Sequence, residues 1–256
     1  MFKLATWNVN SLRVRLPHVL DWLSSQRPDA LCLQETKVTD AEFPYEPLRA
    51  AGYHVAHVGQ KSYNGVATLT RVPPTEVVPA PAGLDGEQKR ALIVSVGGVR
   101  VVNVYVPNGE SVDSPKYPFK LAWYDALRQY LAGELQRHPL LAVVGDFNVA
   151  PEPRDVHDPK RWAGKVLFSE PERAALQALI ATGLTDVFRQ FEQPEKSFSW
   201  WDYRLNGFAR NWGLRIDHIL ASATLAQRSR GCTIDKTPRA LERPSDHAPV
   251  VAEFDL

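Results

Sequence analysis

The sequence contains little cysteine and no long hydrophobic run. Two cysteines, Cys32 and Cys232, occur among 256 residues, and neither has the spacing of a zinc site or of a disulfide framework. We therefore expect two reduced thiols in a cytoplasmic protein. No run of about 18 apolar residues is present, so we expect no membrane-spanning segment. The N-terminal residues also lack the apolar stretch and cleavage site of a signal peptide.

The sequence also has almost no net charge. Thirty Lys and Arg residues balance 29 Asp and Glu residues, which leaves +1 and no whole-protein field to attract nucleic acid. A DNA-binding surface would therefore need a local group of basic residues. The candidates lie in loop-like stretches and are Arg13, Arg15, Lys89, Arg90, Lys116, Lys120, Lys160, Arg161, Arg204, Arg210 and Arg215. Because scattered Lys and Arg are usually solvated surface, these residues alone do not establish DNA binding.

Apolar residues are plentiful and follow both strand and helix spacings, which predicts one domain over residues 1–256. Strand patterns occupy residues 4–9, 30–34, 65–70, 91–96, 99–106, 140–145, 214–220 and 249–254. Gly97 and Gly98 predict a hairpin turn between two of these strands. Helices are expected over residues 16–26, 118–136 and 170–181. Many strands and few helices favour packed sheets with helices outside them. Four long connections are candidate functional loops: 107–117, 147–168, 202–213 and 235–248.

Polar side chains follow several of these strands. The buried run that ends at Gly145 delivers Asp146 and Asn148, spaced by two, onto one face, and the glycine permits close backbone approach. Glu35 follows another apolar run, and Asn8 and Asn10 end the first strand. Each motif also has a simpler interpretation, because Gly, Asp and Asn are ordinary turn residues and strands commonly emerge into water.

Two further sites strengthen the pattern. Asp217 lies inside an apolar strand, where an unpaired carboxylate is costly, so it should have a partner. Asp246 and His247 stand just before the last strand. A lone histidine is more often structural than catalytic. A histidine beside one aspartate, with a second buried aspartate in need of a partner, is a better catalytic candidate.

This set of Glu, Asp, Asn and His side chains suits phosphodiester hydrolysis. Hard oxygen ligands select Mg²⁺ or Mn²⁺, and Mg²⁺ takes only one or two carboxylates besides phosphate oxygens. The remaining carboxylates are then free for acid–base work. Hydrolysis needs an in-line water, charge neutralisation on the phosphate and help for the leaving oxygen, which these residue types can supply.

The sequence resembles the exonuclease III family of AP endonucleases, within the DNase-I-like endonuclease/exonuclease/phosphatase superfamily. Eight stretches match in family order and span almost the whole chain: residues 7–13, 33–37, 65–67, 103–109, 145–148, 198–203, 213–217 and 245–249. The resemblance implies a four-layer α/β sandwich, in which two mixed β-sheets pack face to face with helices outside. It also implies metal-dependent hydrolysis of the DNA backbone 5′ to abasic sites, with 3′-5′ exonuclease or 3′-phosphatase activity on duplex DNA.

The resemblance assigns metal ligands and catalytic residues. Glu35 matches the main Mg²⁺ ligand, with Asn8 and Asn10 beside it, and Asn8 would bond the site carboxylates or the phosphate. Asp246 matches a supporting or alternative ligand. The catalytic positions are Asp146, which orients or deprotonates the attacking water, Asn148, which holds the phosphate, His247, which contacts the scissile phosphate, Asp217, which orients His247, and Tyr105, which assists the phosphate or the leaving group.

The resemblance also places the DNA. Trp200, Leu214 and Ile216 match an apolar wall that receives a base-less sugar, whose extrusion is easiest where the base is missing. Arg90 and Asn108 match positions near the DNA backbone. Trp201 is expected to be a core aromatic residue instead. Loops 149–168 and 204–212 vary among relatives, so the balance of activities stays open, as does whether His157 touches DNA.

Two other functions compete with this one. Another phosphohydrolase of the superfamily, acting on inositol phosphates or sphingomyelin, would share the chemistry. The stretches 198–203 and 213–217 favour the DNA-repair branch, and no exposed apolar loop for a membrane is evident. A non-catalytic nucleic-acid binder should have lost site residues, yet every matching position is filled. We expect a monomer that acts on double-stranded DNA containing abasic sites or 3′ ends, without a membrane partner.

Overall fold

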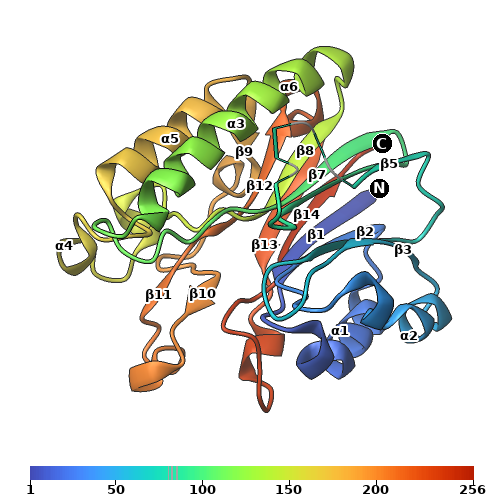
Figure 1. The fold of residues 1–256 in the computed structure, drawn as a ribbon, viewed down its shortest axis with the longest axis horizontal. Helices are drawn as coiled ribbons and strands as arrows, with labels where there is room; N and C mark the ends of the chain where they lie inside the picture. Colours follow the sequence, from blue (N-terminus) through green and yellow to red (C-terminus); the bar gives the residue numbers. More distant parts are fainter. Residues whose placement is uncertain (80, 82, 85) are drawn as a thin grey trace.

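The computed structural model describes residues 1–79, 81, 83–84 and 86–256, and its elements form four layers (Figure 1). Two six-stranded mixed sheets pack face to face, with helices on each outer face. This is the α/β sandwich expected from the sequence, and the prediction is confirmed. No helix among the described residues is long and apolar enough to cross a membrane.

Each sheet contains one parallel pair. The first sheet has the order β13 (Ser229–Ile234), β14 (Val250–Phe254), β1 (Phe2–Asn8), β2 (Ala30–Gln34), β4 (Val66–Thr70) and β3 (His54–Val58), with β1 and β2 parallel. The second has the order β5 (Glu76–Val78), β6 (Ala91–Val96), β7 (Val99–Tyr105), β8 (Leu141–Asp146), β12 (Asp217–Ser222) and β9 (Leu184–Asp186), with β7 and β8 parallel. A two-stranded ribbon joins β10 (Trp200–Trp201) to β11 (Gly213–Leu214).

The helices cover the sheets from outside. In Figure 1, α1 (Leu12–Gln26) and α2 (Tyr45–Ala50) lie over the first sheet, and α3 (Lys116–Arg137) and α5 (Glu170–Ile180) lie over the second. The remaining helices are short: α4 (Pro159–Trp162), α6 (Ala223–Ala226) and the 3₁₀ turns Asp40–Glu42, Pro153–Asp155, Val187–Gln190, Arg204–Asn206 and Thr237–Ala240.

Strand alternation determines which side chains enter the space between the sheets. In β1, Leu4 faces the second sheet, whereas Ala5 and Trp7 pack under the helices. In β8, Ala142 and Val144 face the first sheet. Both sides of these strands are therefore apolar, which explains the uninterrupted hydrophobic runs in the sequence.

The sequence predicted the long elements better than the short ones. The hairpin at Gly97 and Gly98 is present, with φ of 57° and 80°. The strand expected over 214–220 is broken, because Leu214 pairs in the ribbon with Trp200 and only 217–222 joins the second sheet. The first helix begins four residues earlier than expected. Helices α2, α4 and α6 and the strands β3, β5, β9, β10 and β13 were not predicted.

We predict that Gly145→Ala destabilises the fold by about 3 kcal/mol, the upper range for overpacking. Gly145 has φ of 147°, and an ideal Cβ there would lie 1.8 Å from the carbonyl oxygen of Val104 on the adjacent strand. Urea denaturation of both variants would measure the effect. Gly231→Ala is the matched control, because no atom lies within 4 Å of its added Cβ. Equal stabilities for the two variants would contradict the close approach of β7 and β8.

Candidate active site

Polar residues from both sheets meet at one edge of the space between them. Asn8 continues the inward face of β1, in phase with Leu4, and Asp146 continues that of β8, in phase with Val144. The register of the second sheet places Tyr105 and Asp217 on either side of Asp146. The sandwich core therefore ends in a row of ionisable groups.

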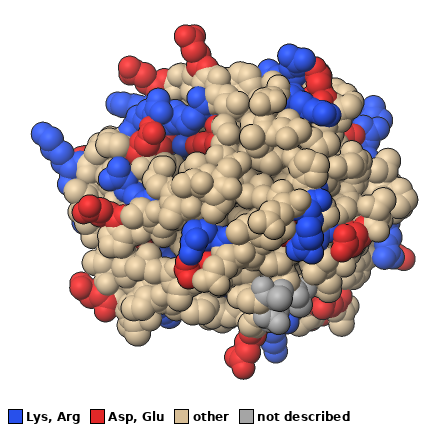
Figure 2. Space-filling model, turned by 90° about the horizontal axis from the view of Figure 1, so that it is seen from above, with Lys and Arg blue, Asp and Glu red and all other residues tan. Residues whose placement is uncertain are grey.

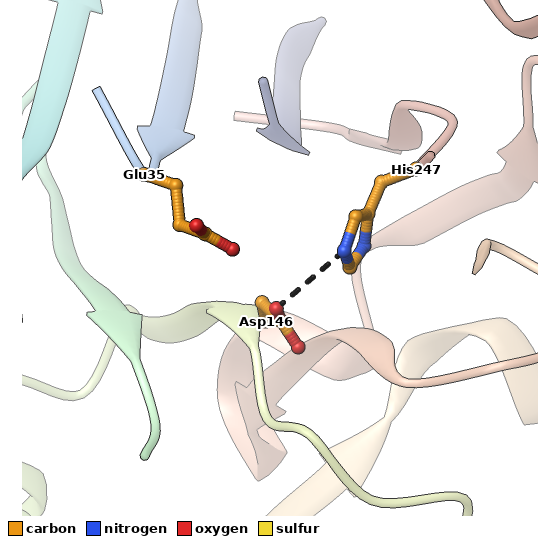
Figure 3. A group of neighbouring side chains, drawn as sticks. All are labelled: Glu35, Asp146 and His247. Carbon is orange, nitrogen blue, oxygen red and sulfur yellow. Dashed lines mark ion pairs between the residues drawn. The ribbon is translucent and has the colours of Figure 1, made fainter. Parts of the chain in front are cut away.

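Three side chains at this edge point toward one another (Figure 3). Oxygen atoms of Glu35 and Asp146 and a ring nitrogen of His247 all lie within 4.8 Å of each other. Asn8 connects the two acids, because its Nδ2 donates to Glu35 Oε1 and to Asp146 Oδ2, both at 2.9 Å. Its Oδ1 accepts from the backbone N–H of Asn10 at 3.0 Å. Asn8 thus directs its N–H groups, not its oxygen, at the acids.

Asp217 is the partner of His247. The ring Nδ1 lies 2.9 Å from Asp217 Oδ2, which also accepts from the Ser199 hydroxyl at 2.6 Å. This leaves Nε2 facing Asp146 at 3.8 Å. Burial by itself lowers the pKa of His247, but the carboxylates of Asp217 and Asp146 outweigh it and raise this pKa to about 10. The imidazole is therefore held as a cation at neutral pH.

Asp146 is buried but well bonded. Besides Asn8, it accepts the backbone N–H of Asn148 on Oδ1 at 2.9 Å. Burial raises the pKa of Asp146 to about 7, against the lowering influence of His247. Glu35 and Asn148 both adopt left-handed backbone conformations, with φ of 51° and 50°. Such strained residues directly after strands are common at functional sites, where surrounding contacts must hold them.

Asn10 and Asp246 form the next contacts outward. Asn10 Nδ2 donates to Asp246 Oδ1 at 3.0 Å, and Trp200 Nε1 donates to Asp246 Oδ2 at 2.9 Å. The ammonium of Lys37 lies 2.6 Å from Asn10 Oδ1 and 2.9 Å from Glu35 Oε2. The oxygens of Asn10 and Glu35 therefore converge on one cation, whereas both oxygens of Asp246 face neutral donors.

Tyr105 and the two amides complete this edge. Burial, reinforced by Glu35 and Asp146, raises the pKa of Tyr105 well above its usual range, so the phenol stays protonated. Arg90 lies over the Tyr105 ring at 4.7 Å. Asn108 Nδ2 donates to Asn148 Oδ1 at 2.9 Å, and Asn148 Nδ2 donates to the Val106 carbonyl at 2.9 Å. One N–H of the Asn148 amide remains for a ligand.

A cavity of about 550 Å³ opens beside Trp200. Its lining includes Trp162 and Trp212 as well as the basic residues Arg161 and Lys165. Leu214 and Ile216 do not line it, because they are 0% and 1% exposed and pack beneath Trp162 and Trp200. Trp200 therefore supplies part of the cavity surface and the two aliphatic residues pack behind it, and the role of all three in receiving a base-less sugar stays a prediction.

Other residues differ from expectation as well. Lys120 and Arg215 are buried in ion pairs with Glu172 and Asp155, so they are not surface contacts for DNA.

The surface charges are mixed in sign on the face drawn in Figure 2, where Lys and Arg are interspersed with Asp and Glu. Trp201 is a fully buried core residue, as predicted.

Three residues that contact the site were not predicted from the sequence to have a role there. Lys37 bonds Glu35, Ser199 bonds Asp217, and the Ser245 hydroxyl donates to the Asn8 carbonyl at 2.6 Å. All three lie inside the stretches that carry the family resemblance, and their place in those stretches could have identified them as site residues.

Comparisons with known proteins agree with this geometry. A family described as "Endonuclease/Exonuclease/phosphatase family" matches residues 5–247. The chain is 42% identical to exodeoxyribonuclease III of Haemophilus influenzae, over 98% of this chain and 99% of the relative. A 3′ phosphatase from Neisseria, solved bound to a product DNA hairpin, superposes with a TM-score of 0.98 at 46% identity. An AP endonuclease from Archaeoglobus fulgidus superposes with a TM-score of 0.96 at 41% identity. Both structural matches cover the full length of both chains.

Proposed function

Because the chain belongs to the endonuclease/exonuclease/phosphatase family, we propose that it hydrolyses the backbone of damaged DNA. It is a DNA-repair phosphodiesterase of the exodeoxyribonuclease III and AP endonuclease type, whose activities comprise incision 5′ to abasic sites, 3′-5′ exonuclease action or 3′-phosphate removal. One observation carries this conclusion. Glu35, Asp146 and His247 come from distant segments and converge within 4.8 Å, with Asn8 bonded to both acids.

The family is metal-dependent, and the residues present fit a hard divalent cation. We propose Mg²⁺, with Mn²⁺ as a substitute, because Glu35 offers a carboxylate oxygen at this site. Asn10 would be a second ligand of the cation, because its Oδ1 and Glu35 Oε2 already contact one positive group, the ammonium of Lys37. Asn8 and Asp246 better suit a role in holding Glu35, Asp146 and Asn10 in place. When bound, the cation would neutralise charge on the phosphate.

The remaining groups suit the other parts of the reaction. A carboxylate whose pKa lies near 7 is an effective proton acceptor, so Asp146 would orient and deprotonate the attacking water. The imidazolium of His247, fixed by Asp217, would donate from Nε2 to a phosphoryl oxygen as its negative charge grows. Asn148 would hold the same phosphate through its remaining N–H. The protonated Tyr105 would donate to the phosphate or to the leaving oxygen.

The cavity beside Trp200 supports recognition of an extrahelical sugar. Trp200 bonds Asp246 and pairs with His247 through an isolated backbone bridge, so its ring is attached directly to the catalytic edge. An abasic sugar enters such a recess at the smallest cost, because no base needs to be unstacked. Arg90 and Asn108, on the opposite side of Asp146, would contact the DNA backbone and position it without reading sequence.

We also propose that residues 1–256 act as one domain and as a monomer in the cytoplasm. The site draws on both sheets and on residues from Asn8 to His247, so neither half of the chain contains it alone. Cys32 and Cys232 are buried free thiols, which suits a reducing compartment.

A duplex with one natural abasic site, which keeps its aldehyde, would test the function. We predict incision on the 5′ side of the lesion with Mg²⁺ present, leaving a 3′-hydroxyl and a 5′-deoxyribose phosphate, and none with EDTA. Gel mobility distinguishes these ends from those of β-elimination, which would contradict hydrolysis. Assaying abasic, 3′-phosphate and plain recessed duplexes side by side would then rank the three activities. A chain that binds these duplexes but cuts none would be a non-catalytic binder.

A further inference from the structure

Helix α3 bonds the turn that carries Asp146 and Asn148. Tyr124 donates its hydroxyl to the Phe147 carbonyl at 2.5 Å. One turn earlier on the same helix face, the Lys120 ammonium donates to the Asn148 carbonyl at 2.6 Å and to the Asn108 carbonyl at 3.0 Å. Two successive carbonyls of the 147–148 turn are therefore held by side chains of one helix.

These two donors are themselves fixed. Lys120 and Tyr124 are 0% and 1% exposed. The third bond of the ammonium goes to the buried carboxylate of Glu172 on α5. Glu172 also accepts the backbone N–H groups of Leu167 and Ser169, both at 3.0 Å. All three N–H groups of this buried ammonium are bonded, so its position is fixed and it can support the turn rigidly.

The turn needs such support because its conformation is strained. Asn148 has φ of 50°, and in this conformation its backbone N–H donates to Asp146 Oδ1 while its side-chain Oδ1 accepts from Asn108. A backbone held in the left-handed region persists only when surrounding contacts over-determine it. Lys120 bonds the carbonyl of this same residue, directly after its strained φ.

We propose that Lys120 and Tyr124 are positioning residues for the hydrolysis, an inference that rests on the proposed function. They hold the main chain of residues 147–148, and through it they aim the Asp146 carboxylate and the Asn148 amide at the phosphate. Neither residue touches the substrate. Their removal should slow the chemical step much more than it weakens DNA binding, because Asn148 and Asn108 are only two of the groups expected to contact the DNA backbone.

Tyr124→Phe tests this most cleanly, since it deletes one hydroxyl and leaves the ring. We expect the single-turnover cleavage rate at saturating abasic duplex to fall about tenfold, because small misplacements of reacting groups are costly. Fluorescence anisotropy should give an unchanged Kd in EDTA. Tyr130→Phe is the matched control: it removes a hydroxyl from the same helix, beside Arg100 and Glu134, and should keep the wild-type rate.

A second variant tests Lys120. Lys120→Met alone would leave Glu172 charged and unpaired in the core, so Glu172→Gln accompanies it. The pair should lower the single-turnover rate more than Tyr124→Phe does, in preparations that circular dichroism shows to be folded at the assay temperature. Normal rates in both variants would overturn the inference. So would rates that fall only in proportion to the folded fraction. The wild-type protein is run alongside: if it cleaves no abasic duplex with Mg²⁺ present, the proposed function itself fails.

Discussion

Replacing Asp146 with Asn should lower kcat about a thousandfold or more while leaving DNA affinity nearly unchanged. The substitution keeps the shape of the side chain but removes the group that accepts the proton of the attacking water. That interaction develops only in the transition state, so its loss appears in kcat and not in binding. Single-turnover cleavage of an abasic duplex with Mg²⁺ measures the first quantity, and anisotropy in EDTA measures the second.

The same variant should keep its thermal stability. Burial raises the pKa of Asp146 to about 7, which means that the ionised carboxylate is held in the fold at an energetic cost. A neutral amide removes that cost but cannot accept both the Asn8 and the Asn148 N–H, so the two effects oppose each other and Tm should stay nearly the same. Asp125→Asn, on the exposed side of α3, is the control and should change neither rate nor affinity. Weakened binding with near-normal turnover would mean that Asp146 holds DNA and that another group activates water.

Local sequence patterns predicted the catalytic edge because strand alternation is a short-range property. The run ending in Gly145 and Asp146 fixes which face the carboxylate takes, and the same holds for Asn8 in β1. The eight stretches that match the family in order then assigned both strands to the same fold. The close approach of β7 to Gly145 was also foreseeable, since only glycine tolerates it.

Partners far apart in the chain could not be predicted in this way. Lys120 and Arg215 were grouped with surface residues because Lys and Arg are usually exposed. Each is instead neutralised by an acid 52 or 60 residues away, and no local pattern predicts those ion pairs. Leu214 and Ile216 illustrate the same limit, since their burial depends on Trp162 and Trp200.

The short strands could not be predicted from the sequence for a related reason. Strands β5 and β9 contain three residues each and lie at the edges of the second sheet. Their pairing with neighbours, not their own propensity, makes them strands. The break between β11 and β12 likewise comes from Ser199, whose hydroxyl accepts the N–H groups of Ile216 and Asp217, both at 3.1 Å.

Asp217→Asn should lower kcat about a hundred- to a thousandfold and should narrow the pH range of activity. Asp217 is the nearest of the three acids that raise the pKa of His247 from 6.5 to about 10, the others being Asp146 and Asp246. With the amide in its place, burial lowers this pKa again. The imidazolium is then lost at a lower pH, so the alkaline limb of the kcat profile should move toward neutrality. Asp255→Asn, in an exposed pair with Arg230, should leave the profile unchanged.

The same pair should make stability depend on pH in a defined direction. Because the folded pKa of His247 exceeds its ordinary value of 6.5, the ion pair stabilises the fold fully below that value. The stabilisation declines as pH rises and is gone above about 10. Urea denaturation across this range should show the decline in the wild type and a much weaker one in Asp217→Asn. Asp217→Asn could instead lose activity while its kcat and its stability keep the wild-type dependence on pH. Asp217 would then orient the His247 ring without setting its charge. The phosphate would then meet a neutral imidazole, because no other acid comes as close to His247 as Asp217 does.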